Sequence, residues 1–146
     1  MDKEAMFYEK IDNYINCKLC PHRCSKLKEG QRGACGVREV KKDDDGSLKL
    51  YSINYGEITS ISMDPIEKKP LYNFYPGSNI LSIGSFGCNF KCSFCQNYAI
   101  SQNRPQSNYV PPEEMANISL EINNNLGLAF TYNEPSIWYE YVYDVC

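Results

Sequence analysis

Two dense groups of cysteine constrain the fold of this chain more than any other feature. Together they hold seven of the eight cysteines in 146 residues. Residues 87–97, GCNFKCSFCQN, carry Cys88, Cys92 and Cys95 at gaps of three and two residues. Residues 17–38 carry Cys17, Cys20, Cys24 and Cys35. Because the N-terminus lacks the apolar core of a signal peptide, such short gaps favour metal binding over disulfide bonds.

Composition excludes several classes of function. A hydrophobic fraction of 42% allows a buried core, and 146 residues are enough for about one ordinary domain. A net charge of -3 gives no electrostatic case for nucleic acid, and no stretch approaches the roughly 20 apolar residues of a membrane span. The single histidine, His22, argues against a Ser-His-Asp triad or a histidine-rich metal site. We therefore expect a cytoplasmic protein that binds neither nucleic acid nor membrane.

Residues 1–63 are predicted to form a small cysteine-rich region that contains a helix and a β-hairpin. The helix is expected over 2–16, where apolar side chains recur at helical spacing at Phe7, Ile11, Tyr14 and Ile15. The hairpin is expected around Asp45-Gly46, a dipeptide typical of tight turns. A further strand is predicted over 57–63.

The rest of the chain is predicted to be a linker followed by an α/β region. Residues 64–78 contain three prolines and no regular apolar period, so they read as an extended linker that packs by its aromatic side chains. Residues 79–146 alternate strand and helix. The strands are predicted over 79–85 and 126–132, and the helices over 111–125 and 133–145, each with proline in its first turn. This βαβα order is typical of a parallel sheet or an α/β barrel.

The α/β pattern is also short. Two βα units are too few for a barrel that typically has eight, and the apolar pattern of the last helix runs to the final residues. We therefore expect the sequence to be an N-terminal fragment of a longer domain.

Cys88, Cys92 and Cys95 supply three soft ligands with no fourth close by. Thiolates suit zinc or an iron–sulfur cluster, and a structural zinc site is normally closed by a fourth residue. The next cysteine is Cys146, at the far end of a predicted helix. One coordination position is thus expected to stay open, at the carboxyl end of a strand where α/β folds place their sites. A structural zinc knuckle is the alternative.

Cys17, Cys20, Cys24 and Cys35 supply four thiols, with His22 among them. Four thiolates can close a tetrahedral zinc site or hold a second iron–sulfur cluster, and a loop-rich segment with little core commonly depends on such a metal. The spacing matches no standard zinc finger, so both metals remain open. The alternative is a set of reduced structural cysteines.

The motifs around the cysteines resemble one family. The spacing Cys88-x3-Cys92-x2-Cys95 after a short strand resembles the radical S-adenosylmethionine (radical SAM) enzymes. LSIGSFGCNFKCSFCQN is similar to their pyruvate formate-lyase activating-enzyme-like branch. Within it, CPHRC, DPIEKKPLYNFYPGS, CQNYAISQ and TYNEPSIWYEY resemble the radical SAM enzymes of the AmmeMemoRadiSam system. The resemblance runs from Cys17 to the end and implies the N-terminal part of a partial (β/α) radical SAM barrel over 79–146.

The resemblance implies that Cys88, Cys92 and Cys95 hold a [4Fe–4S] cluster whose open iron binds S-adenosylmethionine (SAM). Reductive cleavage of SAM would give methionine and a 5′-deoxyadenosyl radical that abstracts hydrogen from a substrate. That substrate is a glycine of a glycyl-radical enzyme, or another protein or small molecule. The motifs name no catalytic residue. A donor such as flavodoxin or ferredoxin is expected to supply the electron. The alternative function is a non-catalytic, metal-stabilised binding or redox module.

Three further residues are candidate SAM contacts by the same resemblance. Phe94 matches the aromatic position near the adenine, and its alternative role is to fill the core. Asn133 and Glu134 match the Gly-Gly-Glu element at the end of the second strand, although the glycines are absent here. A carboxylate at Glu134 could accept a charge-assisted hydrogen bond from the SAM amino group. The alternative is a capping Asn133 and an exposed first-turn Glu134.

The family pattern also differs at one position. Asn73 stands where a histidine is common before FYPGS, so any role of that histidine is absent here. Lys68 and Lys69 precede it and are candidate substrate contacts or solvated side chains.

Overall fold

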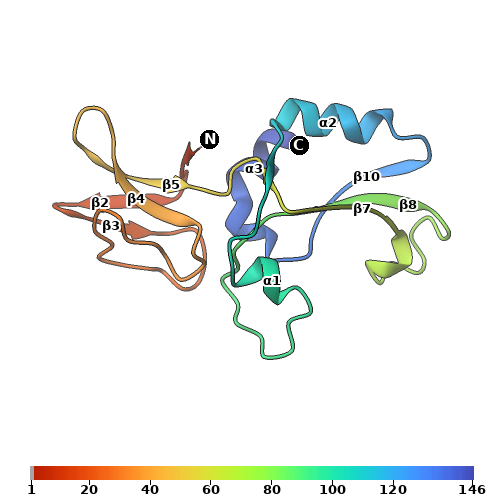
Figure 1. Ribbon diagram of the computed structural model, residues 1–146, viewed down its shortest axis with the longest axis horizontal. Coiled ribbons are helices and arrows are strands. Elements are labelled where there is room, and N and C mark those ends of the chain that lie inside the picture. The colour runs from red at the N-terminus through yellow and green to blue at the C-terminus, as the bar shows by residue number, and fades with distance from the viewer. Residues whose placement is uncertain (1) are drawn as a thin grey trace.

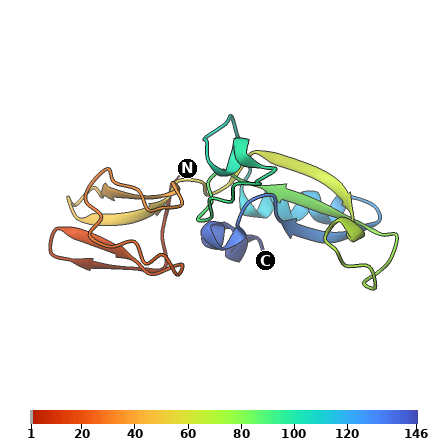
Figure 2. The same cartoon turned by 90° about the horizontal axis from the view of Figure 1, so that it is seen from below.

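The computed structural model describes residues 2–146, and it consists of two lobes side by side along the longest axis (Figures 1 and 2). The first lobe is all β. Its strands are β1 (Lys3–Glu4), β2 (Tyr8–Ile11), β3 (Tyr14–Cys17), β4 (Arg38–Lys42) and β5 (Leu48–Ser52). The second lobe is mixed α/β and holds the elements that follow β5.

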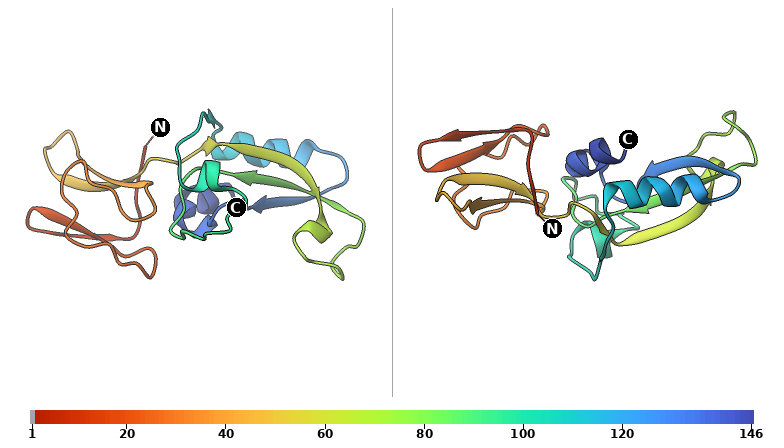
Figure 3. Two further views of the ribbon diagram at one scale, coloured as in Figure 1. Left: turned by 60° about the horizontal axis from the view of Figure 1, so that its bottom comes forward. Right: turned by 90° about the horizontal axis from the view of Figure 1, so that it is seen from above.

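The first lobe stacks two small antiparallel sheets, which Figure 3 shows as two layers. One layer is the β2–β3 hairpin and the other has the order β1-β5-β4. Their shared core holds Ala5, Ile15, Cys17, Val40 and Leu50. The predicted turn at Asp45-Gly46 is confirmed: it joins β4 to β5, with Gly46 at a φ of 77° that suits glycine.

The helix predicted over residues 2–16 is wrong. That segment forms β1, β2 and β3, and β2 turns back into β3 at Asp12, whose φ of 50° is one that aspartate tolerates. The helical spacing was misleading because Tyr14 and Ile15 belong to a strand antiparallel to the one that holds Ile11. Two short strands joined by a tight turn thus gave the apolar spacing that is typical of one amphipathic helix.

The second lobe is built on a three-stranded sheet in the order β10-β8-β7. Its strands are β7 (Ser60–Pro65), β8 (Asn79–Gly84) and β10 (Asn125–Phe130). β8 and β10 are parallel, and β7 is antiparallel to β8. A short two-stranded sheet joins β6 (Glu57–Ile58) to β9 (Asn108–Tyr109). The parallel βαβ unit that the sequence predicted is therefore present.

The helices of this lobe are α1 (Tyr98–Ser101), α2 (Pro112–Glu121) and α3 (Tyr139–Val145), with 3-10 turns η1 (Ile66–Lys68) and η2 (Pro135–Trp138). α2 and α3 cover one face of the sheet. Their core includes Leu81, Ile83, Met115, Trp138 and Tyr141. Both predicted helices exist. The second starts as η2 before it becomes α3.

The segment 64–78 is only partly the linker that was predicted. Its first two residues complete β7, and Ile66 is fully buried. Its aromatic side chains do not pack as expected, since Tyr72, Phe74 and Tyr75 are 67%, 51% and 64% exposed.

The two lobes meet through a small apolar core and a buried ion pair. Cys35, Val37 and Ile53 of the first lobe pack with Phe86 and Ile137 of the second. Beside them, Arg38 of β4 lies 2.6 Å from Glu140 of α3, with both side chains almost fully buried. Figure 1 shows α3 beside the β lobe. Within residues 2–146, no helix has the length and apolar character to cross a membrane.

Candidate functional site

The three closely spaced cysteines lie on one loop, residues 85–97, which we call the cysteine loop. It leaves the carboxyl end of β8 and runs into α1. Two hydrogen bonds fix its ends: Gly87 N donates to Ile100 O at 2.9 Å, and Asn97 Nδ2 donates to Tyr132 O at 2.7 Å. The second bond ties the loop to the end of β10. The loop therefore stands where parallel sheets present their binding sites.

The thiols of the cysteine loop are accessible to different degrees. Cys88 and Cys95 are half-buried and Cys92 is exposed, and all three are free thiols. Cys88 Sγ accepts a hydrogen bond from Phe90 N at 3.4 Å, and Cys95 Sγ lies 3.4 Å from Ser101 Oγ. Among residues 2–146, no three Cys, His, Asp or Glu side chains converge closely enough to hold a metal ion. The three cysteines are thus close together in sequence, but their sulfur atoms do not point to a common position.

Asn133 and Glu134 follow β10 and lie beside the cysteine loop. Asn133 Nδ2 donates to Gly87 O at 2.7 Å, so this side chain holds the start of the loop. Glu134 Oε1 accepts a hydrogen bond from Ser136 N at 3.1 Å and thereby caps η2. The capping role considered for Asn133 therefore falls to Glu134.

Phe94 lies on the outer surface of the cysteine loop. Its side chain is 85% exposed, which rules out the alternative that it fills the core. Asn73 also lies in an exposed loop.

The first lobe contacts the cysteine loop directly. His22 Nε2 lies 2.7 Å from Asn89 O, and Asn89 is buried with no hydrogen-bond partner on Oδ1. Gly87 has a φ of 84°, and a β-carbon there would lie 2.4 Å from Val37 Cγ1 and 2.8 Å from Cys35 O. Only glycine combines a positive φ with the absence of a β-carbon, so only glycine fits here. The close approach of the two lobes was not visible from the sequence.

Cys17, Cys20, Cys24 and Cys35 form what we call the N-terminal cysteine group. Cys17 N donates to Cys24 O at 2.8 Å, which places these two cysteines on neighbouring segments. Burial raises the pKa of the Cys17 thiol, and the nearby Cys24 and Cys20 raise it further. Burial also raises the pKa of Cys35, again with a contribution from Cys17. Cys17 is thus within electrostatic range of the other three thiols, although the four sulfur atoms do not converge on one point among residues 2–146.

Backbone amides donate to three of these sulfur atoms. Ala34 N donates to Cys24 Sγ at 3.3 Å. Cys17 and Cys35 each accept from the amide two residues further along, Leu19 and Val37. Such N–H donors around sulfur stabilise the thiolate form that binds metal.

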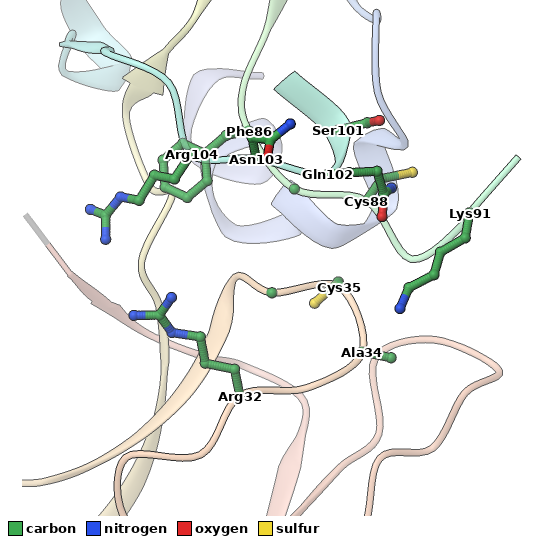
Figure 4. A pocket seen from close by; sticks show the side chains of 12 residues that line it. Arg32, Ala34, Cys35, Phe86, Cys88, Lys91, Ser101, Gln102, Asn103 and Arg104 are labelled. Atoms are coloured by element: carbon green, nitrogen blue, oxygen red, sulfur yellow. The ribbon is translucent and has the colours of Figure 1, made fainter. Parts of the chain in front are cut away.

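A cavity of about 260 Å³ lies between the lobes, next to the cysteine loop (Figure 4). It is lined from the first lobe by residues 32 and 34–36, and from the second by parts of the cysteine loop and by residues 101–104. Cys35 and Cys88, one from each cysteine motif, both line it. The cavity is therefore shared by the two regions that the sequence singled out.

Asp64 of β7 is a functional candidate that the sequence analysis missed. It is buried on the face of the sheet opposite α2 and α3, since it pairs with Ile80 and so shares the face of Ser82. Lys68 and Lys69 donate to it at 2.7 and 2.8 Å, and Tyr132 Oη at 3.0 Å. Burial by itself would raise the pKa of Asp64, but these hydrogen bonds outweigh it and hold that pKa far below its ordinary value.

The Asp64 contacts also give Lys68 and Lys69 a role that neither earlier interpretation anticipated. Both ammonium groups are ion-paired to Asp64, and the side chain of Lys69 is only 15% exposed. Lys69 also lies over the ring of Tyr132, 5.3 Å from its centroid. The DPIEKKP motif thus builds a compact charged network beside the end of β10.

Part of the second lobe matches a known family. Residues 82–146, from within β8 through α3, match the family model of the Radical SAM superfamily. The matched segment contains the whole cysteine loop together with Asn133 and Glu134. It spans somewhat less than half of the chain.

Two proteins of Methanocaldococcus jannaschii are similar in sequence. Uncharacterized protein MJ0808 is 44% identical, over 97% of this chain and 42% of the relative. Uncharacterized protein MJ0674 is 34% identical, over 72% of this chain and 26% of the relative. The chain thus spans less than half the length of either relative. No solved structure matches it.

Proposed function

We propose that this chain carries the cofactor-binding part of a radical SAM enzyme from the pyruvate formate-lyase activating-enzyme-like branch, of the AmmeMemoRadiSam type. The observation that carries the proposal is the cysteine loop at the carboxyl end of β8, within the segment that matches the superfamily. The activase-like and AmmeMemoRadiSam assignments rest on the motifs alone. The fold supports the proposal, since β8 and β10 form a parallel βαβ unit such as begins an α/β barrel.

The residues of the loop suit a [4Fe–4S] cluster bound through Cys88, Cys92 and Cys95. Three soft thiol donors leave one iron without a protein ligand, and all three side chains are at least partly accessible. A backbone amide already donates to Cys88 Sγ, as is common around ligating sulfur. When bound, the cluster and SAM together supply reductive cleavage of SAM and a 5′-deoxyadenosyl radical. Ligation requires the three cysteine side chains to turn toward one point.

The neighbouring residues would position the cofactors. Asn133 holds the Gly87 carbonyl and so fixes the start of the cysteine loop. The carboxylate of Glu134 would accept a hydrogen bond from the SAM amino group. In the structure this carboxylate accepts from the backbone amide of Ser136. Phe94 is exposed and free to pack on the adenine. The substrate is proposed to be a protein or a small molecule.

The test is the response of the reconstituted protein to SAM. The chain is loaded anaerobically with iron and sulfide, reduced, and examined by electron paramagnetic resonance with and without SAM. A SAM-dependent change in the signal, followed by release of 5′-deoxyadenosine, supports the proposal. Glu134→Gln should weaken the SAM response about tenfold, the scale of one charge-assisted hydrogen bond. A cluster whose spectrum ignores SAM indicates the non-catalytic redox module instead.

We also propose that the N-terminal cysteine group binds one structural zinc ion. Four thiols close a tetrahedral site, which suits a structural rather than a catalytic metal. The Ala34 amide that donates to Cys24 Sγ supports a thiolate ligand there. Burial raises the pKa of Cys17 and Cys35, so these two thiols would lose their protons to the metal on binding. Metal analysis should find about one zinc per chain, lost in Cys17→Ser/Cys20→Ser and retained in Cys146→Ser. Iron and inorganic sulfide at these four positions would replace this assignment with a second iron–sulfur cluster.

We infer a cytoplasmic location and a small redox protein as electron donor. Free thiols and an oxygen-sensitive cluster both suit a reducing compartment. A donor such as flavodoxin or ferredoxin would supply the electron. Neither nucleic acid nor a membrane is proposed as a partner.

A further inference from the structure

The cavity between the lobes carries a charge opposite to that of the protein. The chain has a net charge of -3, yet three cationic side chains and no Asp or Glu line this cavity within the described chain. They are Arg32, Lys91 and Arg104. They come from three separate segments: the first lobe, the cysteine loop and the segment after α1. Folding therefore collects positive charge around one cavity, which Cys88 also lines.

Two of these three charges have no carboxylate partner in the part of the chain that the structure describes. Lys91 and Arg104 make no ion pair with any residue in 2–146. Arg104 lies over the ring of Phe86, 4.9 Å from its centroid, which positions the guanidinium at the cavity. Arg32 is paired with Glu39 through Nε, at 2.6 Å, and Glu39 is not part of the lining. Its remaining guanidinium N–H groups keep donor capacity for a ligand.

Figure 4 shows the positions of these side chains. The guanidinium groups of Arg32 and Arg104 lie toward one end of the cavity, and Lys91 lies toward the other. Cys88 and Cys35 are between them. The amides of Gln102 and Asn103 add polar lining. An anion in this space would meet positive charge from both ends.

The size of the cavity limits what it can hold. At about 260 Å³ it is smaller than the roughly 300–1,000 Å³ of a pocket for a whole drug-sized ligand. It suits one charged group of a larger molecule. Guanidinium groups match the geometry of phosphate and carboxylate oxygens in particular.

We propose that this cavity binds a phosphate or carboxylate group of the substrate and holds it beside the cysteine loop. The proposal rests on the function proposed above in one respect, namely that the ligand is the substrate of chemistry at that loop. Anion binding itself depends only on residues of this chain. The substrate class is thus an anionic molecule whose charged group is held by the interface of the two lobes.

The test is a calorimetric titration of the full chain with inorganic pyrophosphate and, separately, with citrate. Saturable binding of one anion per chain is expected for one or both probes. Lys91→Gln/Arg104→Gln should weaken it about tenfold, which corresponds to removal of two charge contacts from exposed residues. This variant leaves the Arg32–Glu39 pair intact.

A matched control comes from a second cavity of about 420 Å³ in the first lobe. Lys10 and Lys28 line it together with the acidic Asp12 and Glu29. Lys10→Gln/Lys28→Gln removes the same net charge and should bind pyrophosphate or citrate as the unaltered chain does. Equal weakening in both variants would show unspecific attraction and overturn the inference, as would no saturable binding of either probe.

Two further outcomes separate this inference from the proposed function. If the chain assembles its cluster and responds to SAM but binds neither anion, the inference fails alone. If the anion binds but no cluster assembles on the cysteine loop, the proposed function fails, and with it the assignment of the anion as its substrate. Competition between SAM and pyrophosphate in the reconstituted protein would assign the cavity to SAM and overturn the inference.

Discussion

Replacement of Glu140 by glutamine should destabilise the protein severely. The side chains of Arg38 and Glu140 are only 2% and 1% exposed, and they are joined by contacts of 2.8 and 2.6 Å. Glu140→Gln removes the negative charge and keeps nearly the same shape, so Arg38 is left buried with only Ile137 O, at 3.0 Å, as an acceptor beside the new amide. Breaking a buried ion pair by loss of one charge costs about 3–5 kcal/mol.

The expected loss is large enough to measure in two ways. For a chain of this size, about 3–5 kcal/mol corresponds to a fall in Tm of roughly 10–15 °C. Urea unfolding can be followed by the fluorescence of Trp138, the single tryptophan, which is 1% exposed, with circular dichroism as a second probe. The urea concentration at the midpoint of unfolding should fall, and the fall should be the same whether fluorescence or circular dichroism is followed.

Two controls separate the ion pair from general effects. Lys42 and Glu29 form a pair at 2.7 Å with both side chains about half exposed, so Glu29→Gln should change the free energy of unfolding by less than about 1 kcal/mol. Arg38→Met/Glu140→Leu removes both charges and should recover most of the loss. If Glu140→Gln costs no more than Glu29→Gln, the reasoning about this interface is refuted.

Three other predictions follow from single residues. Gly87→Ala should destabilise the chain by about 2–4 kcal/mol, because its β-carbon meets Val37 and its φ is positive; a change below 0.5 kcal/mol in urea unfolding would contradict this. Asp64→Asn should reduce stability at neutral pH. Because the pKa of Asp64 is lowered on folding, that difference should persist down to about pH 4 and shrink below it, which unfolding at several pH values would show. Phe94→Ala should leave Tm unchanged within about 2 °C, since the ring is 85% exposed, while weakening SAM binding to the reconstituted protein.

The second lobe was largely predictable because each of its elements is encoded locally. Apolar runs mark β8 and β10, and Pro112 and Pro135 lie in the first turns of α2 and η2. The Asp45-Gly46 hairpin was predictable for the same reason. The strands of residues 2–17 were not, because a tight turn between two short strands produced an apolar spacing that a helix would also give.

The parts of the site that depend on distant contacts could not be predicted. Arg38 and Glu140 are 102 residues apart, and no local pattern links them. Asp64 belonged to the segment predicted to be a linker, yet its partners include Tyr132 from beyond β10. The cationic cavity likewise exists only because the first lobe packs against the cysteine loop. The spacing of Cys88, Cys92 and Cys95, in contrast, predicted the candidate cluster-binding loop directly.

The central claim is that Cys88, Cys92 and Cys95 hold one [4Fe–4S] cluster. The most direct measurement is the iron and sulfide content of the anaerobically reconstituted chain, compared with a Cys88→Ala/Cys92→Ala/Cys95→Ala variant and with Cys146→Ala as the control. We predict about four iron and four sulfide ions per chain in the unaltered protein and in the control, and their loss in the triple variant. Equal iron and sulfide in the triple variant would contradict the claim.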